Sequence, residues 1–73
     1  MTNKEFRVLL ILLGFKFTHV DDKYWVAKTD RITVFYYGFI KKYGLKIYNK
    51  FKYKSIDDLT EVIQLIEEEY DSR

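Results

Sequence analysis

The only histidine of the chain, His19, stands just before a pair of carboxylates, Asp21 and Asp22. Imidazole and carboxylate groups are common metal ligands, so this "HVDD" segment is the first place to look for site chemistry. Neighbouring carboxylates on an extended segment point apart, however, and no further ligand lies close in the sequence. The following "DDK" is also typical of a turn. We therefore expect no metal site here and place His19 at the end of a strand.

A second concentration of functional groups is the stretch "GLKIYNKFKYKS" at residues 44–55, where lysines alternate with apolar or aromatic residues. Lysine ammonium groups can follow the phosphates of a nucleic acid, and aromatic rings can stack on its bases. Alternate residues of one strand share a face of the sheet. The sequence therefore predicts one candidate binding face that joins these lysines to aromatic residues of earlier strands. Its members are Tyr24, Phe35, Tyr37, Lys46, Tyr48, Lys50 and Lys52.

Three interpretations of this face remain open. Lysines keep many sheet edges soluble, and cross-strand aromatic pairs stabilise an open face without any ligand. The same residues would also serve a single-strand nucleic-acid binder, with the rings stacking on bases and the lysines on phosphates. The third interpretation is contact with another protein, most simply a second copy of this chain. The formal net charge of only +2 favours protein contact, because it gives little long-range attraction for a polyanion.

The ingredients of an enzyme are missing from the sequence. A catalytic site needs a nucleophile beside a base, paired acids across a cleft, or a glycine loop that holds phosphate. None of these patterns occurs, and the triplet Glu67, Glu68 and Glu69 is typical of a solvated helix face. We expect no catalysis, no cofactor and no small-molecule substrate.

The N-terminal segment has the pattern of a helix over residues 3–13. Thr2 and Glu5 have the spacing of a capping box, and Gly14 is a residue that commonly ends a helix. Its apolar residues cover more than one stripe, so the helix is either buried on most sides or packed against a second chain. We predict a homodimer, with these surplus residues as candidate dimer contacts. They are Val8, Ile11 and Leu12.

The central part of the chain changes to a period of two, which is typical of strands. The successive runs are "FKFTHV", "YWVAK", "RITVFYY" and "LKIYNKFKY", with the last read as one strand over residues 45–53. With Thr29 and Asp30 as a two-residue turn, Ala27 would oppose Ile32. The better core face of the resulting sheet collects Phe15, Phe17, Trp25, Ala27, Ile32, Val34, Tyr36, Leu45, Ile47 and Phe51.

A second helix is predicted over residues 56–70, since Ser55 and Asp58 repeat the spacing of a cap and acids occupy the first turn. The element order is α-β-β-β(-β)-α. This order predicts an α+β domain in which a three- or four-stranded antiparallel meander carries two helices packed on one face.

Length and charge limit the remaining possibilities. A chain of 73 residues allows one domain over residues 1–73, and its lack of cysteine excludes disulfide or thiolate-metal staples. Acids are absent from residues 41–54 and concentrated after residue 55. The opening "MTNKEFRVLLILLGF" differs from a signal peptide by its Glu5, its short apolar run and the absence of a small-residue cleavage site. We expect a cytoplasmic protein that does not enter membranes.

The opening "NKEFRVLLILLGFKF" is similar to the helix-then-"GF" start of small toxin RNases of the HicA type, and the element order resembles the double-stranded-RNA-binding domain. The residues that carry activity in those families differ here. No Ser-His pair stands where such an RNase carries its catalytic histidine, and "SIDDL" replaces the lysine cluster of a double-stranded-RNA binder. These resemblances therefore imply topology alone. The bias toward Lys, Ile, Tyr and Asn also looks similar to small uncharacterised proteins of AT-rich prophages.

Overall fold

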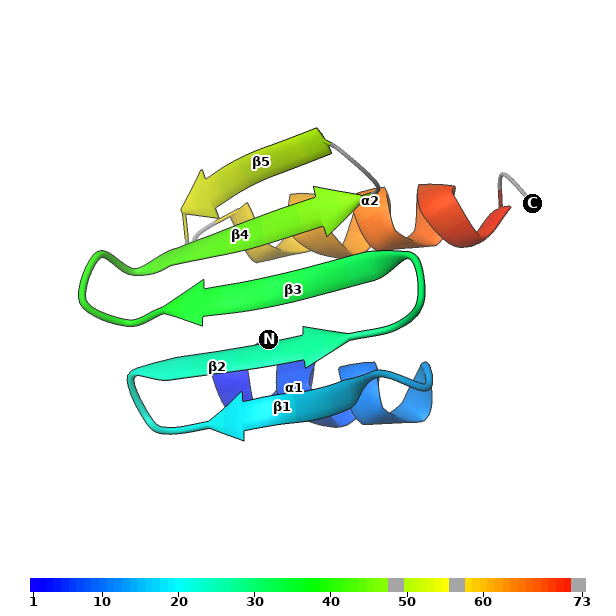
Figure 1. Cartoon of the computed structure of the whole chain (residues 1–73). Coiled ribbons are helices and arrows are strands. Elements are labelled where there is room, and N and C mark those ends of the chain that lie inside the picture. The colour runs from blue at the N-terminus through cyan, green and yellow to red at the C-terminus, as the bar shows by residue number, and fades with distance from the viewer. Residues whose placement is uncertain (48–49, 56–57, 72–73) are drawn as a thin grey trace.

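Five antiparallel strands form one open sheet, and a helix precedes and follows them in the chain (Figure 1). The structure is a computed structural model that describes the backbone of residues 1–47, 50–55 and 58–71 and the side chains of residues 1–47, 55 and 58–69. Strand order in the sheet equals chain order. The elements are α1 (Asn3–Leu12), β1 (Lys16–Val20), β2 (Tyr24–Lys28), β3 (Ile32–Tyr37), β4 (Lys42–Ile47), β5 (Lys50–Ser55) and α2 (Leu59–Asp71).

The predicted α+β class, the meander and the placement of both helices on one face are confirmed (Figure 1). The sheet has five strands instead of three or four, because the expected strand over residues 45–53 is two strands. β4 ends at Ile47, and Ile47 pairs with Lys50 at the start of β5. Lysines occupy even-numbered positions on both sides of this connection, so the alternation of the sequence carries no sign of a break.

Local hydrogen bonds fix the start of α1 at the predicted residue, whereas α2 begins at Leu59 instead of residue 56. In the capping box of α1, the Thr2 hydroxyl accepts from the Glu5 amide at 3.2 Å and the Thr2 amide donates to Glu5 Oε1 at 2.9 Å. The bond from the Thr2 amide, together with a smaller effect of the Thr2 side chain, stabilises the carboxylate and lowers the pKa of Glu5. Gly14 follows α1 with a φ of 93°, a left-handed conformation that suits glycine. Before α2, the Ser55 hydroxyl donates to Asp58 Oδ2 at 3.0 Å.

The hairpin between β2 and β3 is shifted by two residues from the predicted register. Ala27 pairs with Val34 instead of Ile32, and the turn residues are Asp30 and Arg31. The Thr29 hydroxyl causes this shift, because it accepts from the amides of Arg31 and Ile32 at 3.3 and 3.1 Å and so closes the turn one residue later. A shift of two residues leaves every side chain on its predicted face.

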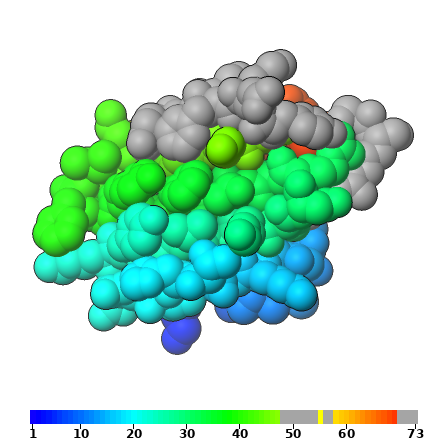
Figure 2. All heavy atoms as spheres, in the orientation of Figure 1, coloured from blue at the N-terminus to red at the C-terminus, as the bar shows by residue number. Residues whose placement is uncertain are grey.

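Both helices cover the same face of the sheet, which we call the covered face; the opposite side is the open face, turned toward the viewer in Figures 1 and 2. Partly buried Phe17 and Ile47 pack against the core between sheet and helices. Its buried members among the described residues are Phe6, Leu10, Phe15, Trp25, Ala27, Ile32, Val34, Tyr36, Tyr43, Leu45, Leu59, Val62 and Ile66.

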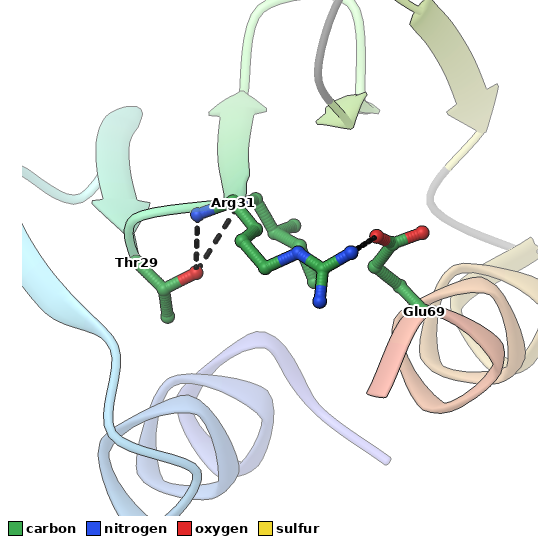
Figure 3. A network of polar contacts seen from close by, with 4 residues as sticks. Thr29, Arg31 and Glu69 are labelled. Atoms are coloured by element: carbon green, nitrogen blue, oxygen red, sulfur yellow. Dashed lines mark hydrogen bonds and ion pairs between the residues drawn. The ribbon is translucent and has the colours of Figure 1, made fainter. Parts of the chain in front are cut away.

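Polar groups attach each helix to the sheet as well. At the start of α1, the Asn3 side chain donates to the Tyr43 hydroxyl at 2.9 Å and accepts from Trp25 Nε1 at 3.1 Å. Near the end of α2, Glu69 forms an ion pair with Arg31 of the β2–β3 turn at 3.0 Å (Figure 3). Each helix is therefore attached to the sheet by polar contacts in addition to its apolar contacts.

Candidate functional site

The open face brings together the three described aromatic residues of the predicted binding face. The rings of Tyr24 and Tyr37 lie 5.6 Å apart between centroids, and Phe35 stacks on Tyr37 at 6.1 Å with an interplanar angle of 10°. His19 extends this group, because its ring lies 5.2 Å from Tyr24. Tyr24, Phe35 and Tyr37 are half-buried, so each ring is held in place by its neighbours and still reaches the surface.

A β-bulge accounts for the position of His19. The ladder between β1 and β2 shifts between Phe17 and His19, so that His19 pairs with Val26 of the open face. Simple alternation would place His19 with Phe15 and Phe17 on the covered face. The extra residue of a bulge reverses the alternation after it, and the bulge is a property of the pairing that the sequence of one strand does not reveal.

Lysines surround the aromatic group on the open face. Lys46 is exposed and pairs with Thr33, which pairs in turn with Lys28, and Lys28 pairs with Lys16. The ladder thus aligns three lysines in one row across β1 to β4. Lys42 pairs with Tyr37 and adds a charge beside the rings. Sequence reasoning missed Lys42 because "IKKYG" has the pattern of a turn, although β4 already begins at this residue.

The remaining members of the predicted face need correction or lie outside the described residues. Tyr48 lies outside them, and so do the side chains of Lys50 and Lys52. The backbone ladder pairs Lys50 with Ile47 and Lys52 with Leu45, which are positions of the covered face. Phe51 pairs with Lys46 and so occupies an open-face position, opposite to the prediction. Both errors follow from treating β4 and β5 as one strand, because a hairpin with a two-residue connection exchanges the faces of odd and even positions.

The second candidate surface is the exposed side of α1. Val8, Ile11 and Leu12 are 51%, 59% and 78% exposed. Beside them runs a shallow hollow of about 230 Å³, which we call the α1 groove. Its lining residues are Lys4, Arg7, Val8, Ile11, Phe17 and Val20. The α1 groove therefore has an apolar floor and two cations on its rim.

The α1 groove also contains a buried hydrogen-bond donor that lacks an acceptor among the described residues. The Nε of Arg7 is buried and has no hydrogen-bond partner among the described residues. A buried donor without an acceptor costs free energy, and an acceptor supplied by a partner would recover it. This atom distinguishes the groove from an ordinary apolar depression.

Among the described residues, the buried Tyr43 has a titratable side chain with a shifted pKa. Burial raises the pKa of the Tyr43 phenol, and the hydrogen bond from Asn3 offsets part of this rise. The shift thus has a structural cause, the packing of Tyr43 beneath α1. Within residues 1–47, 55 and 58–69, no three His, Asp or Glu side chains lie close enough to hold a metal ion together. None of the described helices has the length and apolar character needed to cross a bilayer.

The similarity of the opening segment to the HicA-type RNases and of the composition to prophage proteins remains a prediction. Comparison of the chain with protein-family models, with curated proteins and with solved structures finds no match.

Proposed function

We propose that this protein is a non-enzymatic interaction domain that forms a homodimer through α1. The observation that carries the proposal is the exposure of Val8, Ile11 and Leu12 on a helix whose opposite side, with Phe6 and Leu10, is fully buried. A domain of this length buries only about 60% of the surface of its unfolded chain, so a partner that covers an apolar helix adds to a small core.

A second copy of the chain suits this surface better than an unrelated protein does. In an antiparallel, two-fold packing of two α1 helices, Val8 of one copy lies level with the partner's Ile11. Arg7 then lies level with the partner's Leu12, at the end of that helix. The last turn of α1 has no basic residue, and the negative end of its dipole favours a cation. The rim cations of each α1 groove would therefore complement the helix end of the other copy.

The test is the mass of the protein in solution, measured by sedimentation and by light scattering at increasing concentration. We expect twice the 8.9 kDa of one chain. Leu12→Lys places a charge at the most exposed of the three positions and should yield a folded monomer with an unchanged circular dichroism spectrum. Gln64→Lys, at an exposed position of α2, is the matched control and should remain dimeric.

Two results would refute the dimer. One is a native chain that stays monomeric at high concentration, and the other is a folded Leu12→Lys variant with the same dimer mass as the native chain. Ile11→Lys provides a second charge substitution at an exposed position, in case Leu12→Lys aggregates.

The proposal includes a cytoplasmic location and, on composition, an origin in an AT-rich prophage. Small secreted domains usually depend on disulfides, and this chain has no cysteine. A cytoplasmic dimer would obtain from its partner the stability that disulfides give to secreted domains of this size. Fractionation of cells that express the tagged protein tests the location.

A further inference from the structure

The open face carries a charge distribution that homodimerisation through α1 does not use. The strand ladder orders its described residues into three rows that cross the strands. The first row is Lys16, Lys28, Thr33 and Lys46; the second is His19, Val26, Phe35 and Gly44; the third is Tyr24, Tyr37 and Lys42. The face thus has a cationic row at one side and aromatic rings beside it.

The spacing between the rows and between the strands suits the binding of an extended polymer. Successive residues on one face of a strand are about 7 Å apart, and neighbouring strands are about 4.8 Å apart. A chain that crosses the strands along the cationic row would therefore meet the ammonium groups of Lys16, Lys28 and Lys46 in succession. Flat groups that project sideways from this chain would reach the rings of the second and third rows.

The charged side chains at the described strand positions of the open face are all positive. The described strand positions of the open face contain no carboxylate. The acids of α2, including Glu61, Glu67 and Glu68, belong to a helix on the covered side of the sheet (Figure 1). The net charge of +2 therefore understates the positive field in front of the open face.

We propose that the open face binds single-stranded nucleic acid that runs across β1 to β4. Phosphates lie along Lys16, Lys28 and Lys46, and unpaired bases stack on the rings of Phe35, Tyr37 and Tyr24. Bases of a duplex are stacked on each other and cannot reach such rings, so the aromatic rows select single strands. The half-buried rings are already held at mutual distances of 5.6 and 6.1 Å, which reduces the ordering that binding requires.

The test is fluorescence anisotropy with labelled DNA and RNA oligonucleotides of about 15 nucleotides, a length that fills a binding face of this kind. Binding should weaken steeply between about 50 and 200 mM salt. Tyr37→Ala should weaken binding by about 5- to 150-fold, the loss of one base stack. Its matched control is Phe39→Ala, which removes an exposed aromatic ring from the β3–β4 turn and should have little effect.

The lysine row is tested separately, through the dependence of the affinity on salt concentration. Replacing both Lys28 and Lys46 by Gln should lower the slope of log affinity against log salt by about 1.4, since each phosphate contact to a single strand contributes about 0.7. Lys41→Gln removes one charge from the exposed β3–β4 turn, outside the lysine row and the α1 groove, and should leave this slope unchanged. Comparison of the DNA and RNA oligonucleotides then shows whether the face distinguishes the two sugars.

Several outcomes would overturn the proposal, provided that circular dichroism shows folded proteins. These outcomes are no binding of any oligonucleotide at low salt, equal losses for Tyr37→Ala and Phe39→Ala, and duplex DNA bound as tightly as single strands. Competition by polyglutamate as effective as that by the oligonucleotide would show charge attraction without base stacking and would also refute it. Because Leu12→Lys changes only α1, its nucleic-acid affinity separates this proposal from failure of the homodimer.

Discussion

The two helices lie on the same face of the sheet but present opposite surfaces to solvent. Exposed described residues of α2 are all polar, namely Thr60, Glu61, Gln64, Glu67 and Glu68. α1 instead exposes the aliphatic side chains of Val8, Ile11 and Leu12. Polar residues complete the solvated surface of α2, whereas α1 has apolar area left over after the core is filled. This difference is the reason why the proposed homodimer contact is placed at α1 and not at α2.

The inner sides of the helices are also attached differently. α1 inserts the ring of Phe6 between Trp25 and Tyr43, at centroid distances of 5.9 and 5.4 Å. α2 contributes smaller aliphatic residues to the same core, Leu59, Val62 and Ile66. Among the described residues, the helix with the apolar outer surface is therefore also the one with the largest buried side chain, and the following substitutions test this contrast.

The largest effect is expected from Phe6→Ala. The side chain is fully buried, and its removal should lower the free energy of unfolding by about 3–5 kcal/mol. A domain of this length has about 4–11 kcal/mol in total, so the variant should be near the limit of folding. Urea denaturation of Phe6→Ala and of Ile66→Ala compares the two anchors. A larger loss for Ile66→Ala would reverse the assignment of the main anchor to α1.

The next effect concerns the polar connection of α1. Asn3→Leu would leave Trp25 Nε1 and the Tyr43 hydroxyl without their partner, at a cost of about 1–3 kcal/mol for such unsatisfied groups. Asn3→Asp keeps the oxygen that accepts from Trp25 Nε1 and replaces the donor to Tyr43 by an oxygen to which the Tyr43 hydroxyl can donate, so it should lose less. Thermal denaturation of the two variants measures the difference. Equal stability of Asn3→Leu and the native protein would mean that water replaces the Asn3 side chain.

The polar connection of α2 should contribute less. Arg31 and Glu69 are 24% and 15% exposed, and partly solvated pairs of this kind contribute about 0–1 kcal/mol. Both residues have further interactions, so a double-mutant cycle with Arg31→Gln and Glu69→Gln is the suitable measurement. The coupling should shrink in high salt. A coupling as large as the loss in Asn3→Leu would make the two connections equivalent.

The smallest effect on stability is expected only at alkaline pH, where tyrosine side chains lose their proton. Burial raises the pKa of Tyr43 above its ordinary value of 10.0, so the folded protein keeps this proton longer than the unfolded chain. The stability that Tyr43 contributes is fully present below about pH 10 and is lost as the pH rises through the folded pKa. Urea denaturation across this range should show a steeper alkaline decline for the native protein than for Tyr43→Phe. Parallel declines would assign the alkaline loss to other groups.

The parts of the fold that depend on nearby residues were predictable from the sequence. The capping box of α1 joins residues three apart, and the division of β2 and β3 into two faces depends only on alternation. The predicted faces of β2 and β3 are therefore correct although their turn lies one residue later, because this changes the register by two residues, an even number.

Features that depend on pairing between strands were not predictable. The connection between β4 and β5 interrupts neither the alternation nor the lysine pattern, and the bulge before His19 exists only relative to β2. The start of β4 was not predictable either, since Lys41 adopts a positive φ of 52°, a conformation that is more usual for glycine. The bulge decides that His19 lies beside the rings, and the two features of β4 decide which lysines do.

The meander topology also affects the order in which the chain can fold. Every strand pairs with the strand before it, so the sheet can grow by one hairpin at a time without closing a long loop. The attachment of α1 to the sheet is different, because Asn3 contacts Tyr43 across 40 residues of chain. During synthesis, α1 leaves the ribosome before the strands but lacks this partner until β4 has followed. Its polar attachment to the sheet therefore forms later than the hairpins of β1 to β3, and its apolar surface stays available in the nascent chain during that time.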